Sequence, residues 1–144
     1  TLDCAAILDA TAILLQCPAS FRPTEPAIAR MREFLSRARR PAGVRLLWEP
    51  RGPWPDEVVR GLCEELDLTH AADPFLRPSL TPMAYYRLHG ITGARHVYTD
   101  AELAQLADTV SAGPAYVMFN NLPRAADAGR FSQLVSRDPG ARRD

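Results

Sequence analysis

The sequence is short of cysteine and of long hydrophobic runs, and each shortage argues against a class of protein. Its three cysteines, at positions 4, 17 and 63, form no CxxC pair. This spacing argues against a disulfide framework or a zinc knuckle and favours a reducing, cytoplasmic compartment. The apolar runs fall well short of the roughly 18 residues that a membrane span needs, so we expect no membrane partner.

An excess of charge of one sign is also missing. The 17 basic residues, all of them arginine, balance 17 acidic residues, so the formal net charge is zero. A generic nucleic-acid-binding domain is strongly basic, and a nucleic-acid partner is therefore not favoured. With 144 residues, 47% of them hydrophobic and 24% charged, the chain has the composition of a globular domain with a substantial core.

Apolar patterning predicts strands that alternate with helices. Short apolar runs predict buried strands at 12–16, 44–48, 68–72, 84–88 and 115–119. Helical spacing predicts helices at about 25–38, 55–66 and 123–135, and one that ends near residue 110. Thr24 is expected to cap the first of these, whereas Thr99 and Glu102 predict a capping box. The alternation indicates an α/β class with parallel βαβ units, and it leaves an open sheet and part of a barrel as alternatives.

Six stretches of the chain, taken in order, carry the motifs of one family. They are residues 14–24, 48–54, 70–75, 85–90, 98–103 and 116–121. Together they resemble the YecE-like domain of unknown function, over about residues 3–135. The resemblance implies a partial TIM-like (β/α) barrel of about five parallel strands, in which residues 1–136 are the C-terminal portion of one domain. Residues 137–144 are then a polar tail, and a missing N-terminal segment or a partner chain completes the barrel. The resemblance implies a fold but no reaction.

Polar residues end or follow every predicted strand, which is where parallel βα folds place their ligands. We predict Glu49, Asp73 and His89 as catalytic residues, because carboxylates and imidazole transfer protons. Strand alternation places Arg87 and His89 on one face of their strand. Arg51 and Arg87 would hold an anionic group such as phosphate or carboxylate. The predicted substrate-binding residues are Gln16, Arg51, Trp54, Arg87, Asn120 and Asn121.

Other interpretations use the same residues. A buried network of ion pairs and hydrogen bonds needs the same side chains. Glu49, Asp73, His89 and Asn120 are also metal-ligand types, but no H-x-H or HExxH pattern accompanies them, so no metal or other cofactor is assigned. We expect a TIM-barrel-like enzyme or ligand-binding protein with a strand-end pocket for a small anionic or phosphorylated substrate. The alternatives are a nucleic-acid-binding or metal-dependent phosphodiester-processing protein, and a non-catalytic binding or assembly module.

Overall fold

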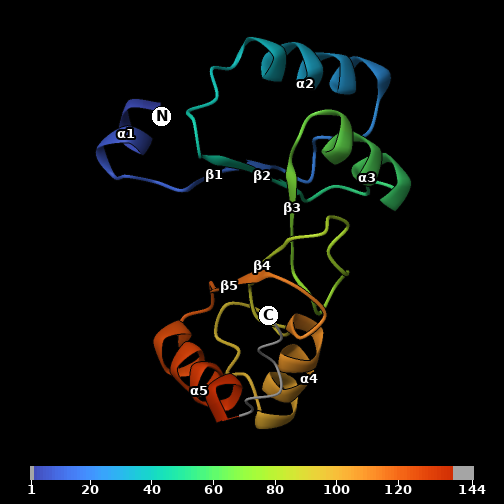
Figure 1. Ribbon diagram of the computed structural model, residues 1–144. Helices are drawn as coiled ribbons and strands as arrows, with labels where there is room; N and C mark the ends of the chain where they lie inside the picture. Colours follow the sequence, from blue (N-terminus) through green and yellow to red (C-terminus); the bar gives the residue numbers. More distant parts are fainter. Residues whose placement is uncertain (1, 138–144) are drawn as a thin grey trace. The chain divides into compact units, whose positions relative to one another are not determined.

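The computed structural model describes residues 2–137, and the chain divides into two compact units, residues 1–71 and 72–144. The first unit holds α1 (Leu2–Ile7), β1 (Ala12–Cys17), α2 (Glu25–Arg37), β2 (Arg45–Pro50), α3 (Asp56–Glu65) and β3 (Thr69–Ala72), which ends at the boundary. The second unit holds β4 (Ala84–Leu88), α4 (Asp100–Val110), β5 (Ala115–Phe119) and α5 (Arg124–Arg137) (Figure 1). Strands thus alternate with helices, as the sequence predicted. From residue 138 onward, the predicted polar tail lies outside the described residues.

The first unit is built around β2, which is buried along its whole length after Arg45. It pairs in parallel with β1, from Ala12 opposite Arg45 to Cys17 opposite Pro50, and in parallel with β3. A strand covered on both faces has a continuous apolar sequence, and this is why residues 46–48 do not alternate with polar ones. The strand runs to Pro50, past its predicted end at residue 48, because its pairing with β1 continues to Pro50.

The helices α2 and α3 begin at residues that the sequence partly identified. Thr24 is the N-cap residue of α2, but its side chain accepts no capping hydrogen bond, so that prediction was wrong in mechanism. Pro26 lies in the first turn of α2, where its missing N–H costs nothing because that donor has no partner within a helix. Pro55 is the N-cap residue of α3 rather than its first helical residue.

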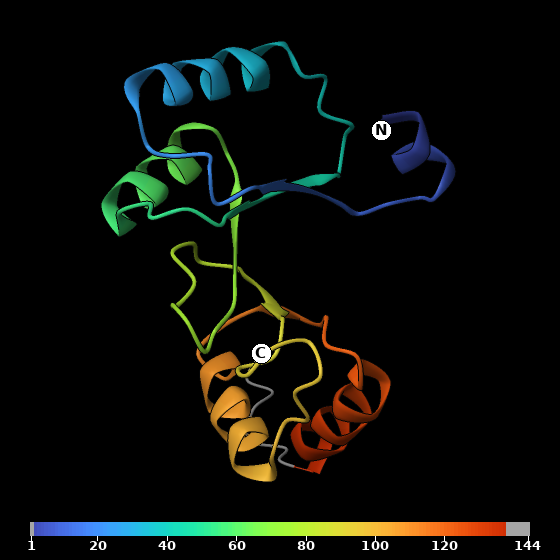
Figure 2. The ribbon, with the colours of Figure 1, turned by 180° about the vertical axis from the view of Figure 1, so that it is seen from behind.

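The second unit packs α4 and α5 together on one side of its two parallel strands, β4 and β5, as Figures 1 and 2 show. These are the last two strands in the order β1-β2-β3-β4-β5. The strand β4 alternates between buried and half-buried residues, and its buried side chains are those that join the apolar core. The core residues are Ala84, Tyr86, Leu88, Tyr98, Leu103, Leu106 and Phe131. Alternation therefore places Tyr85 and Arg87 on the face of β4 that points away from the core.

The predicted capping box at the start of α4 is confirmed. The backbone N–H of Glu102 donates to the Thr99 hydroxyl over 3.2 Å, and the backbone N–H of Thr99 donates to the Glu102 carboxylate over 2.7 Å. Two N–H groups that a helix start leaves without partners are satisfied in this way. The box fixes where the loop of residues 90–98 ends and α4 begins.

Candidate strand-end site

Three polar residues meet in the second unit, and each directly follows a strand. Asp73 comes after β3, His89 after β4 and Asn120 after β5. The backbone N–H of His89 donates to Asp73 Oδ2 over 3.1 Å, and Asn120 Nδ2 lies 3.2 Å from His89 Nδ1. The carboxyl ends of parallel strands meet at one edge of a sheet, which is why residues far apart in sequence converge here.

The contact with Asn120 matches one tautomer of His89. The Asn120 amide nitrogen faces Nδ1, and a neutral imidazole that accepts a hydrogen bond at Nδ1 carries its proton on Nε2. Asp73 acts on the backbone of the same residue, and its second oxygen, Oδ1, accepts the backbone N–H of Phe75 over 3.1 Å. Both Asp73 oxygens thus hold backbone donors, which gives this carboxylate a positioning role. Its predicted catalytic role stays a prediction.

The residue after His89 must be glycine. Gly90 has a φ of +92°, and a Cβ atom placed there would lie 2.2 Å from the backbone oxygen of Gly93. No side chain fits at that distance without moving the loop. The backbone N–H of Gly90 donates to the Tyr98 hydroxyl over 3.0 Å, and burial raises the pKa of Tyr98 to about 12. The loop that carries His89 and Gly90 is therefore tied to the core of the second unit.

The first unit gathers a different group of predicted residues. Gln16 lies opposite Glu49 in the register of β1 and β2, near the carboxyl ends of both strands. Arg51 directly follows β2, and its Nε lies 2.8 Å from Oε1 of Glu49. The Glu49 side chain is 8% exposed and the Arg51 side chain is 40% exposed, so a buried carboxylate holds a guanidinium that solvent reaches.

Trp54, predicted to bind substrate, lies inside the first unit. It is 4% exposed, and its indole N–H donates to the backbone oxygen of Phe21 over 2.8 Å. Its ring packs edge-on against Trp48, with ring centroids 5.1 Å apart. These contacts give Trp54 a structural role, since they join two loops of the unit through one buried donor. Contact between Trp54 and a ligand stays a prediction.

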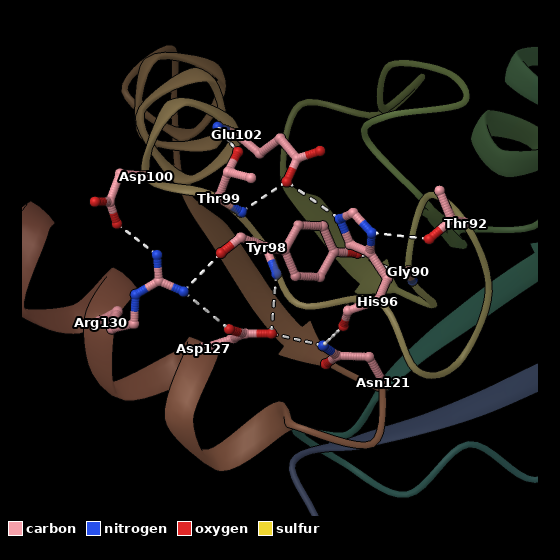
Figure 3. Close-up of polar contacts among 10 residues, drawn as sticks. All are labelled: Gly90, Thr92, His96, Tyr98, Thr99, Asp100, Glu102, Asn121, Asp127 and Arg130. Carbon is pink, nitrogen blue, oxygen red and sulfur yellow. Dashed lines mark hydrogen bonds and ion pairs between the residues drawn. The ribbon is translucent and has the colours of Figure 1, made fainter.

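A buried network around Asp127 was not found by sequence reasoning (Figure 3). Asp127 is completely buried and its Oδ2 accepts from Asn121 Nδ2 over 2.7 Å and from the backbone N–H of Tyr98 over 3.3 Å. Its Oδ1 lies 3.2 Å from Nη1 of Arg130, which also donates to the Tyr98 carbonyl over 2.6 Å. The sequence does carry one signal of this network: Asp127 and Arg130 are three residues apart, a spacing that brings two side chains together on a helix.

Asn121 belongs to this network and was predicted to bind substrate. It is completely buried, and its Nδ2 also donates to the backbone oxygen of His96 over 2.9 Å. Asn121 thus connects the end of β5 to the loop of residues 90–98 and to α5 (Figure 3). Because Asn120 is its chain neighbour, this anchoring also limits where the partner of His89 can lie. Contact between Asn121 and a substrate stays a prediction.

His96 joins the same loop to the capping box of α4. Its Nε2 lies 3.1 Å from Oε2 of Glu102, and its Nδ1 lies 3.1 Å from the hydroxyl of Thr92 (Figure 3). Hydrogen bonds lower the pKa of Glu102, first of all the one from the Thr99 backbone and then those from the side chains of Thr99 and His96. The charged form of Glu102 is therefore part of the folded structure.

Within residues 2–137, no group of three or more His, Cys, Asp or Glu side chains is arranged to hold a metal ion. Over the same part of the chain, no helix has the length and apolar character needed to cross a bilayer.

Comparison with known proteins places the chain among proteins of one fold. A family described as protein of unknown function DUF72 matches residues 8–141. A DUF72 family protein from Thermotoga maritima is 18% identical, with a TM-score of 0.74 over 94% of this chain and 63% of that one. A DUF72 family protein from Enterococcus faecalis is 15% identical, with a TM-score of 0.71 over 99% of this chain and 65% of that one. The chain thus spans less than two thirds of either structure. Comparison with curated sequences gave no match.

Proposed function

Because the chain belongs to the DUF72 family, whose function is unknown, we propose a role from its own geometry: it binds a small anionic or phosphorylated ligand at the carboxyl ends of its strands. The family match confirms the YecE-like resemblance, and the solved relatives confirm an α/β fold consistent with part of a TIM-like barrel. The observation that carries the proposal is the meeting of Asp73, His89 and Asn120, each directly after a strand. Ligands of parallel βα folds bind at this edge.

The four predicted site residues near the strand ends of the second unit have different roles in this proposal. Arg87 lies on β4, two residues before His89, and supplies the positive charge that attracts phosphate or carboxylate. His89 donates from Nε2 to the bound anion or transfers a proton to it. Asn120 sets the orientation and tautomer of that ring through the contact at Nδ1. Asp73 holds the backbone from which His89 projects.

The first unit supports a separate anion-binding point at Arg51. An arriving anion competes with Glu49 for the guanidinium, which is more exposed than its partner. Glu49 lies beside this point with its side chain 8% exposed, and proton transfer is the catalytic role predicted for it. Gln16, opposite Glu49 in the strand register, supplies an amide for the same ligand.

Cys4, Cys17 and Cys63 are all unpaired thiols, which supports a reducing, cytoplasmic compartment.

Thermal unfolding in the presence of inorganic phosphate tests the site in the second unit. We expect phosphate at about ten times its dissociation constant to raise the melting temperature by about 4 °C. Arg87→Gln should reduce this rise to the part that Arg51 contributes, whereas the control Arg95→Gln, the same change at an exposed loop position, should keep it in full.

Two outcomes contradict the proposal. An equal rise for Arg87→Gln and the unaltered protein would show that phosphate acts elsewhere. No rise from phosphate, together with binding of duplex DNA that weakens steeply with salt, would favour the nucleic-acid alternative.

A further inference from the structure

Two paths of hydrogen bonds lead from one buried carboxylate oxygen to the two sides of His89. The oxygen is Oδ2 of Asp127, and the first path begins where it accepts the backbone N–H of Tyr98 over 3.3 Å. The Tyr98 hydroxyl in turn accepts the backbone N–H of Gly90 over 3.0 Å, and Gly90 directly follows His89. This path therefore fixes the backbone on the carboxyl side of His89.

The second path reaches the imidazole ring itself. Asn121 Nδ2 donates to the same Oδ2 of Asp127 over 2.7 Å, and Asn120 is the chain neighbour of Asn121. The backbone N–H of Asn120 donates to the Leu88 carbonyl over 2.8 Å, and its side-chain Nδ2 lies 3.2 Å from Nδ1 of His89. The backbone and the ring of His89 are thus both connected to one oxygen of Asp127.

The residues along both paths have little freedom to move. Tyr98, Asn121 and Asp127 are completely buried, and Figure 3 shows Tyr98 and Asn121 converging on the Asp127 carboxylate. Both hydrogen bonds of Asn121 Nδ2 end on acceptors, the Asp127 carboxylate and the His96 carbonyl, so this amide cannot turn over without setting its own oxygen against them. Hydrogen bonds to a carboxylate are also stronger than those between neutral groups. A change at Asp127 should therefore displace groups on both sides of His89.

We propose that Asp127 is a positioning residue of the strand-end site: through the two paths it holds the His89 ring with Nδ1 against Asn120 and leaves Nε2 for the bound anion. This inference rests on the proposed function, because that function gives Nε2 its contact with the anion. Asp127 is completely buried, so it acts on the ligand only through His89. Its effect is on the geometry and the tautomer of the ring, in addition to its effect on stability.

Arg130 allows positioning to be separated from stabilisation. Its Nη1 lies 3.2 Å from Oδ1 of Asp127, the oxygen that neither path uses, and it also donates to the Tyr98 carbonyl over 2.6 Å. Arg130→Ala therefore weakens the same buried network and leaves the hydrogen bonds at Oδ2 in place. Both Asp127→Ala and Arg130→Ala should lower stability, whereas only Asp127→Ala should change the state of the His89 ring.

Nitrogen NMR of the neutral imidazole, recorded at about pH 8, measures the ratio of the Nε2–H to the Nδ1–H tautomer of His89. The spectrum of His89→Gln identifies its signals among those of the three histidines. We expect Asp127→Ala to lower this ratio about fivefold, because the loss of one hydrogen bond, that of Asn120 to Nδ1, changes an equilibrium by about that factor. Arg130→Ala should leave the ratio unchanged. An unchanged ratio in folded Asp127→Ala, or an equal change in the two variants, would overturn the proposal.

A milder substitution, Tyr98→Phe, tests the proposal even if Asp127→Ala does not fold. It removes the hydroxyl that accepts the Gly90 N–H and keeps an aromatic ring in the core, so the first path is broken and the second is left. We expect the tautomer ratio of His89 to fall by about twofold, because one of two anchors is lost. The same ratio in Tyr98→Phe and in the unaltered protein would also overturn the proposal.

The spectra are recorded without phosphate, so they do not depend on anion binding. If phosphate fails to raise the melting temperature of the unaltered protein, the proposed function fails. A lower tautomer ratio in Asp127→Ala than in Arg130→Ala would still show that Asp127 positions His89.

Discussion

The two units hold their strand-end residues by different means. In the first unit, Glu49 and Arg51 meet through their side chains, and the neighbouring loop is fixed by one indole donor, that of Trp54. In the second unit, Asp73 and Asp127 accept backbone N–H groups, so each carboxylate fixes the path of the chain. An ion pair between side chains can exchange a partner for a ligand, whereas a carboxylate bound to the backbone cannot do so without loosening a loop. Glu49 and Arg51 are therefore suited to binding a ligand, whereas Asp73 and Asp127 are suited to positioning the backbone.

The largest effect should come from neutralising Asp127. An asparagine there presents one oxygen and one NH₂ group to three sets of donors, so at least one donor faces another in a buried site. We expect Asp127→Asn to lower the free energy of unfolding by about 2–3 kcal/mol, measured by urea denaturation. The control Asp108→Asn makes the same change at an exposed position of α4 and should cost less than about 0.5 kcal/mol. Equal losses of unfolding free energy in the two variants would show that Asp127 does not fix the path of the chain, and the contrast drawn between the two units would fail.

A smaller effect is expected in the first unit from Trp54→Phe. This change removes the hydrogen bond to Phe21 and keeps an aromatic ring, and its cost should exceed that of Trp48→Phe by about 1 kcal/mol. Trp48 is the matched control because it is equally enclosed and its Nε1 has no hydrogen-bond partner in the described part of the chain. Denaturation of the two variants side by side measures the difference. If Trp48→Phe costs more, packing rather than the indole donor fixes this loop.

The smallest effect should be a dependence on pH in the second unit. The pKa of Glu102 is lowered from 4.5 in the folded protein, so its charged form stabilises the fold above about pH 4.5. That stabilisation is lost as pH falls through the folded-state pKa. We expect Glu102→Gln to flatten the acid limb of the stability curve, measured by urea denaturation at a series of pH values.

The first unit supplies the control for this experiment. Glu57→Gln makes the same substitution at an exposed position in the first turn of α3, where no capping box is present, and should flatten the acid limb less. An equal flattening by both substitutions would show that the capping box of α4 has no special share in the pH dependence. An unchanged limb for Glu102→Gln would mean that the bonds from Thr99 and His96 do not favour the charged carboxylate.

The sequence predicted the local structure well because its signals are local. The strands predicted at 84–88 and 115–119 coincide with β4 and β5, and the Thr99–Glu102 box forms as expected. A capping box needs only two side chains three residues apart, so no distant contact can displace it easily. Thr24 shows the limit of such reasoning, since it occupies the N-cap position while its side chain makes no capping bond.

The candidate site was predicted in part, for a physical reason. Strand ends can be located from apolar runs, and this placed Asp73, His89 and Asn120 at the ends of their strands. Which side chains then meet depends on the order of the strands in the sheet and on the path of each loop. Pattern alone did not reveal that Asp73 would bind two backbone N–H groups, or that Asn120 would contact His89 Nδ1.

The sequence by itself determined the alternation of strands and helices, the α/β class and the family, because apolar periodicity and short motifs are properties of neighbouring residues. Only the tertiary structure decided that Trp54 and Asn121 are buried and that Asp127 lies at the centre of a polar network. Burial of a polar group is set by residues far away in the chain that surround it and satisfy its hydrogen bonds. For Asp127 those are the Tyr98 backbone, Asn121 and Arg130, which the fold brings together from a loop, a strand end and a helix.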